Sequence, residues 1–133
     1  MAGDSVIAAG FGFRAAATSK SLSDAFARAG GRPPRAAGLT TTVLATAVDK
    51  AGTLAFRAFA GRFGLPVRGI DSATLAAQKT GTKSEASRAA RGTDSVAEAA
   101  ALAAAGAGAR LLGPRVISSD GMATCALAEG EGL

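Results

Sequence analysis

Residues 6–13 have the sequence VIAAGFGF, and the basic residue Arg14 follows directly. A short apolar run bounded by turn-forming residues predicts a buried strand. After a short loop, Ser19 or Ser21 can cap a helix that ends at Gly30 and has its apolar residues on one face. This part of the chain therefore predicts a strand that leads into an amphipathic helix.

Strands and helices continue to alternate along the chain. Thr- and Val-rich residues 39–48 predict a second strand, which ends in a polar turn at 49–52. The helical spacing of Phe56, Phe59 and Phe63 predicts the core face of the next helix. The following elements are a short strand at 67–70, a helix capped by Asp71, a helix capped by Ser84, and an Ala-rich helix that opens with a capping box at 95–98.

The chain closes with a predicted β-hairpin. Strand-like residues at 111–112 and 116–117 precede Asp120-Gly121, a dipeptide typical of a two-residue turn, and 122–127 form the last strand before a frayed tail. Alternating strands and helices predict an α/β domain with helices on both faces of a sheet. The closing hairpin makes that sheet mixed. We expect one domain over residues 1–133.

Missing residue types exclude several classes of site. The chain has no His, which excludes a Ser-His-Asp triad and an imidazole metal ligand. Its one cysteine, Cys125, excludes an internal disulfide, and its mid-strand position predicts a core residue. The sequence shows no signal peptide and no apolar run of membrane-spanning length. We therefore expect a cytoplasmic protein with no metal, no cofactor and no membrane contact.

Positive charge is concentrated in the first half of the chain. Residues 1–66 carry eight Lys and Arg against three Asp and Glu, whereas residues 67–133 carry seven of each. The whole net charge of +5 therefore lies in the first half. On composition alone two explanations stay open, because the charge can solubilise an Ala-rich chain or bind an anionic partner.

The loop after the first strand is the first candidate site, because ligands of open α/β sheets bind beyond the carboxyl ends of strands. Residues 10–15 match the G-x-G-x-x-A pattern of dinucleotide sites. The pattern lies partly inside the strand, however, and no acidic residue follows at the position that holds a ribose. The same loop can instead bind an anion through Arg14 and the hydroxyls of Thr18 and Ser19.

Three further side chains are candidates for catalysis. Asp49 and Lys50 end the second strand, where they can form an acid/base pair or an anion clamp, and a solvated surface turn is the alternative. Glu98 can face a ligand, although its place in the capping box explains it equally well.

At these residues the sequence resembles the family of CobE and the CbiG C-terminal domain, which belongs to cobalamin (vitamin B12) biosynthesis. GFGFRAAATS (10–19) is similar to the opening G-x-G-x-R-x-x-x-T/S segment of that family, and the similarity continues at 45–50, 64–67 and 84–85. It is closest at GTDSVAEAAAL (92–102). The resemblance covers nearly the whole chain, and the length is most similar to stand-alone CobE.

The resemblance implies a three-layer α/β/α domain with a mixed sheet. It also implies a set of ligand-binding residues, which are Gly10, Gly12, Arg14, Thr18, Ser19 and Lys50. Glu98 matches a glutamate of the family. The acidic residue that follows the lysine in the family is missing after Lys50, which weakens an acid/base interpretation there.

The function that the resemblance implies is a step in the corrin-ring pathway. Our leading hypothesis is that the chain binds a polycarboxylate precorrin, as a carrier or an accessory to ring-modifying enzymes. Arg14 and Lys50 would pair with the carboxylates, while Phe11 or Phe13 would lie against the macrocycle. CbiG opens the ring A lactone of a precorrin, so a lactone-opening hydrolase is the alternative, and whether the chain is an enzyme stays open.

Other partners are weighed on composition. The absence of Tyr and Trp and of a dense Lys/Arg stripe on one helix argues against nucleic acid. Methyltransferases of the corrin pathway are candidate protein partners, and a homodimer is compatible with the sequence.

Overall fold

The computed structural model describes residues 6–31, 40–81 and 95–132. Its strands are β1 (Val6–Phe13), β2 (Val43–Ala47), β3 (Val67–Ile70), β4 (Arg110–Leu111), β5 (Val116–Ile117) and β6 (Ala123–Gly130). Its helices are α1 (Ser19–Arg28), α2 (Val48–Ala51), α3 (Leu54–Phe63), α4 (Ser72–Ala76) and α6 (Val96–Ala105). None of these helices is long and apolar enough to cross a membrane.

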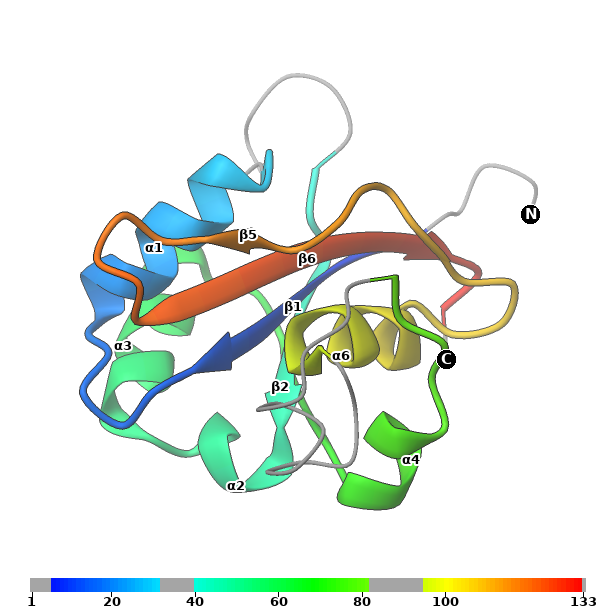
Figure 1. The fold of residues 1–133 in the computed structure, drawn as a ribbon, viewed down its shortest axis with the longest axis horizontal. Coiled ribbons are helices and arrows are strands. Elements are labelled where there is room, and N and C mark those ends of the chain that lie inside the picture. The colour runs from blue at the N-terminus through cyan, green and yellow to red at the C-terminus, as the bar shows by residue number, and fades with distance from the viewer. Residues whose placement is uncertain (1–5, 32–39, 82–94, 133) are drawn as a thin grey trace.

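The six strands form one mixed sheet, as predicted. The strand order is β3-β2-β1-β6-β4, and β5 also pairs with β6. The first three strands are parallel, whereas β6 runs antiparallel to β1 along its whole length, from Val6 opposite Gly130 to Phe13 opposite Ala123. Figure 1 shows α1 and α3 on one side of this sheet and α6 and α4 on the other. The α/β fold class is confirmed.

Phenylalanines fill the face of the sheet that carries α1 and α3. The ring of Phe11 in β1 lies 5.6 Å from Phe56 and 5.1 Å from Phe59, measured between centroids. Cys125 is fully buried in the same cluster. Burial raises the pKa of its thiol, because the apolar surroundings penalise the thiolate. The predicted core roles of the phenylalanine stripe and of Cys125 are therefore confirmed.

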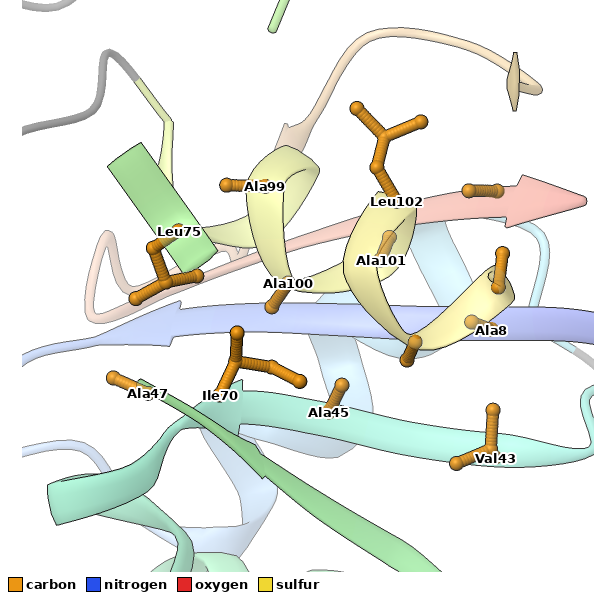
Figure 2. Close-up of a cluster of buried hydrophobic side chains, with 13 residues drawn as sticks. Ala8, Val43, Ala45, Ala47, Ile70, Leu75, Ala99, Ala100, Ala101 and Leu102 are labelled. Atoms are coloured by element: carbon orange, nitrogen blue, oxygen red, sulfur yellow. The ribbon is translucent and has the colours of Figure 1, made fainter. Parts of the chain in front are cut away.

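The opposite face of the sheet is packed with alanines. Figure 2 shows Ala100 and Ala101 of α6 over Ala8 of β1 and Ala45 of β2, with Leu75 of α4 beside them. Such small side chains let the helix approach the sheet closely.

Gly10 marks the closest approach between α6 and the sheet. A Cβ atom added there would lie 2.1 Å from the carbonyl oxygen of Ala97 and 2.4 Å from the nitrogen of Ala101. Gly130 plays the same part in β6, where an added Cβ would lie 2.4 Å from the oxygen of Ala105. Both glycines are therefore required by the position of α6.

Some predicted boundaries differ from the structure. The second strand begins at Val43 rather than at 39, and residues 49–51, predicted as a turn, belong to α2. Thr18, not Ser19 or Ser21, caps α1. Asp71 caps α4 and Gly64 ends α3 in a left-handed conformation, both as predicted. The helix predicted after Ser84 lies outside the described residues.

The C-terminal hairpin is confirmed, although its details differ. Ser118 donates its N–H to the oxygen of Ala123 at 2.8 Å, so the loop spans 119–122 instead of the two residues predicted. The tail is not frayed up to Gly132, whose N–H donates to the oxygen of Ala105 at 2.7 Å.

Two carboxylates attach the hairpin loop to α1. Asp120 accepts hydrogen bonds from the hydroxyls of Ser118 and Ser21, each at 2.6 Å. Asp24 of α1 accepts the backbone N–H of Ser119 at 2.6 Å. Hydrogen bonds from the Ser118 and Ser21 hydroxyls lower the pKa of Asp120 to about 2, and the Ser119 N–H lowers the pKa of Asp24.

These lowered pKa values predict a loss of stability in acid. A carboxyl group whose pKa is lowered in the folded state contributes stability above its unfolded pKa, and that contribution is lost as the pH falls through the folded value. For Asp120 the window runs from 3.8 down to about 2. We expect Asp120→Asn to lose less stability than the wild type across this window in urea unfolding. An equal loss in the two proteins would contradict this assignment.

Candidate anion-binding site

Three parallel strands end at one edge of the sheet, here called the carboxyl edge. It comprises Phe13 at the end of β1 and Arg14 after it, α2 and residues 52–54 after β2, and Asp71 after β3. Residue pairing aligns these ends, because Phe11 lies opposite Thr46 and Ala47 lies opposite Ile70. The structure therefore brings the predicted loops at Arg14 and Lys50 to the same edge.

Lys50 is held over an aromatic ring. Its Nζ atom lies 4.9 Å from the centroid of Phe13, within the range of a cation–π interaction. The Phe13 ring in turn stacks on Phe56 at 5.8 Å with an interplanar angle of 4°. Thr53 donates its N–H and its hydroxyl to the Lys50 oxygen, at 3.1 and 2.8 Å. These contacts fix the backbone of Lys50 and support its ammonium group.

Arg14 adds a second positive charge. The residue is exposed, and its N–H donates to the oxygen of Met122 at 2.9 Å, which anchors the backbone to the hairpin. Within the described residues, neither Arg14 nor Lys50 has an ion pair with a carboxylate. Asp49 is exposed on α2 beside Lys50. Two cations are thus available to an anion that approaches this edge.

The two candidate glycines lie at different depths. Gly10 is buried beneath α6, whereas Gly12 is half-buried beside the first turn of that helix. A Cβ on Gly12 would lie 3.4 Å from the Cβ of Val96 and 3.0 Å from the hydroxyl oxygen of Thr124. Of these two glycines, Gly12 therefore has exposed surface near the carboxyl edge, and Gly10 does not.

The hydroxyls of Thr18 and Ser21 at the start of α1 are used within the protein. The Thr18 hydroxyl accepts the N–H of Ser21 at 3.3 Å, and the Ser21 hydroxyl accepts the N–H of Thr18 at 3.1 Å. Ser19 is the first residue of α1 and is half-buried. This reciprocal pair gives Thr18 a structural role as the helix cap.

Glu98 is fully buried in the first turn of α6. Its Oε1 atom accepts the N–H of Gly81 at 2.8 Å, and its Oε2 atom accepts the N–H of Arg115 at 2.9 Å. The backbone N–H of Glu98 donates to the Ser95 hydroxyl at 3.2 Å. This bond is one half of the predicted capping box, with Ser95 as the N-cap. The side chain therefore ties two distant segments to α6.

Phe11 and Phe13, the two candidates for contact with the macrocycle, differ in burial. Phe11 is completely buried, so it has no surface to offer a ligand, and that expectation is wrong for Phe11. Phe13 is half-buried and lies at the carboxyl edge. Within the part of the chain that the structure describes, no group of three or more Cys, Asp and Glu side chains is placed to hold a metal ion.

Comparisons with known proteins agree with one another. The family model for the cobalamin synthesis G C-terminus matches residues 7–128. The crystal structure of CobE, a protein from the cobalamin (vitamin B12) biosynthetic pathway, superposes with a TM-score of 0.77 at 28% identity, over 94% of this chain and 90% of that one. The cobalamin biosynthesis protein chiG from Agrobacterium tumefaciens str. C58 gives a TM-score of 0.64 at 34% identity, over 92% and 97%. No curated protein matches the chain.

Proposed function

This chain belongs to the family of the cobalamin synthesis G C-terminus, and we propose that it binds a polycarboxylate precorrin intermediate at its carboxyl edge. One observation carries the proposal. Lys50 is held over Phe13, the last residue of β1, and the exposed Arg14 follows Phe13 directly. Precorrins carry carboxylates around their ring. Guanidinium and ammonium groups bind carboxylates through short charge-assisted hydrogen bonds.

The proposed role is that of a carrier or an accessory protein in the cytoplasm. It would present the intermediate to ring-modifying enzymes, and the methyltransferases of the corrin pathway are candidate recipients. Capture of such a methyltransferase by the immobilised protein in the presence of a precorrin would support this role.

Opening of a ring A lactone is the competing activity at the same edge, since Asp49 and Lys50 adjoin on α2. Glu98 is a poor base for such a step because both of its carboxylate oxygens accept backbone N–H groups. We therefore expect no turnover of a lactone-containing precorrin by this chain alone. Turnover that is abolished in Lys50→Ala would assign the hydrolase activity instead.

Co-elution tests the proposed function. Purified protein is mixed with each precorrin intermediate in turn, and visible absorbance is followed through gel filtration. We expect at least one intermediate to elute with the protein. If none does, the proposed function is wrong.

A further inference from the structure

The Phe13 ring connects the Lys50 ammonium to the interior of the protein. Phe13 is half-buried at the end of β1, and the Nζ atom of Lys50 lies 4.9 Å from its ring centroid. The same ring stacks on that of Phe56, a fully buried residue of α3, at 5.8 Å between centroids. One of the two candidate cations is therefore coupled, through Phe13, to the buried phenylalanine cluster.

This contact restricts a side chain that is otherwise flexible. A lysine has a long stem with several rotatable bonds, so rotamer entropy is lost when a ligand fixes its ammonium group. Lys50 is held at both ends. Its backbone oxygen accepts the N–H and the hydroxyl of Thr53, at 3.1 and 2.8 Å, and its Nζ atom lies over the Phe13 ring. Part of the ordering that a bound carboxylate requires is thus present in the free protein.

We propose that Phe13 is a positioning residue, which holds the Lys50 ammonium for a carboxylate of the ligand and does not itself contact the macrocycle. The inference rests on the proposed function and adds to it the way in which one of its cations is oriented. The sequence left Phe13 as a candidate for direct contact with the macrocycle. In the structure, the Phe56 ring and the Lys50 ammonium already lie against the Phe13 ring, and both contacts are internal to the protein.

A double-mutant cycle tests whether Phe13 acts through Lys50. Dissociation constants for purified precorrin intermediates are measured by visible absorbance for the wild type, Phe13→Leu, Lys50→Ala and the double variant. Leucine keeps an apolar side chain but has no aromatic face. We expect Phe13→Leu to weaken binding about fivefold when Lys50 is present, the size of effect expected from one cation–π contact. In the Lys50→Ala background we expect Phe13→Leu to have no further effect.

Phe13→Tyr and Phe63→Leu are the controls. Tyrosine keeps an aromatic face for the ammonium, so Phe13→Tyr is expected to bind as tightly as the wild type. Phe63 is half-buried against the same cluster and lies 5.3 Å from Phe26 and 5.2 Å from Phe59, between centroids. It is the last residue of α3, and within the described residues no cation lies over its ring. We therefore expect Phe63→Leu to leave the dissociation constant unchanged.

The free protein offers a second readout, which needs no ligand. NMR signals of protons that lie over the face of an aromatic ring are shifted upfield. The ε-CH2 protons of Lys50 are expected to show this shift in the wild type and in Phe13→Tyr. In Phe13→Leu they should move to the position of the same protons in Lys20, which is exposed on α1. Absence of an upfield shift in the wild type would show that Phe13 does not hold Lys50.

The outcomes separate the positioning role from the function on which it rests. If Phe13→Leu weakens binding by the same factor with and without Lys50, Phe13 acts independently of that lysine, as it would by touching the macrocycle, and the positioning role is wrong. Unchanged binding in Phe13→Leu, or an equal loss in Phe63→Leu, would also overturn it. If the wild type binds no intermediate, the proposed function itself fails, and the NMR shift of Lys50 still decides whether Phe13 holds its ammonium.

Discussion

Gly10→Ala lowers the free energy of unfolding by about 3 kcal/mol or more, because an added methyl group has no space. Its Cβ would lie 2.1 Å from the Ala97 oxygen and 2.4 Å from the Ala101 nitrogen, both backbone atoms of α6. Neither atom can move without displacing the helix from β1. Urea unfolding followed by circular dichroism measures the change.

Gly61→Ala is the matched control for this prediction. Gly61 lies inside α3, is exposed, and has nothing within 4 Å of an added Cβ. Alanine is favoured over glycine in a helix interior by up to about 1 kcal/mol, so this variant is expected to be as stable as the wild type or more stable. A wild-type unfolding midpoint for Gly10→Ala would show that α6 does not pack on β1 as described.

Glu98→Gln is the second change with a large expected effect. The substitution keeps the shape of a fully buried side chain, but it turns one acceptor oxygen into an NH2 donor. That group would face the N–H of Gly81 or of Arg115, which now donate at 2.8 and 2.9 Å. Loss of a charge-assisted hydrogen bond and an unsatisfied buried donor together cost about 2–3 kcal/mol.

Urea unfolding and amide hydrogen exchange test the role of Glu98. Exchange at Gly81 and Arg115 is expected to accelerate in Glu98→Gln, whereas a general loss of packing would accelerate exchange throughout α6. Glu129→Gln is the control, since its carboxylate pairs with exposed Arg110 and surface pairs contribute little. Equal stability of Glu98→Gln and the wild type would remove the structural role assigned to this carboxylate.

Much of the fold could be predicted from local sequence. The apolar run at 6–13 and the cap at Asp71 depend on neighbouring residues only, and both agree with the structure. The full length of β6 could not be predicted, because it is set by pairing with β1 at the opposite end of the chain. Residues 49–51 are only three residues, two of them charged, so their helical conformation in α2 has no strong local signal.

For the candidate site, the position of Arg14 and Lys50 at one sheet edge could be predicted from the sequence, whereas their contacts could not. The ends of two strands placed Arg14 and Lys50 at one edge without coordinates. The contact of Lys50 with Phe13 depends on how strands and helices pack. The N–H groups of Gly81 and Arg115, which donate to the Glu98 carboxylate, each lie 17 residues away along the chain, so the capping-box position of Glu98 gave no sign of them.

The most direct test of precorrin binding at the carboxyl edge is an equilibrium titration of the wild type and of the double variant Arg14→Ala/Lys50→Ala. Arg28→Ala/Arg110→Ala has the same net charge and removes two cations that are paired with Asp24 and Glu129. With purified precorrin intermediates as probes, we expect binding by the wild type and by this control. The Arg14→Ala/Lys50→Ala protein should bind at least about a hundredfold more weakly, since it loses two charge-assisted contacts that are each worth about 1.5–3 kcal/mol. Equal dissociation constants for the two double variants would contradict a binding site at this edge.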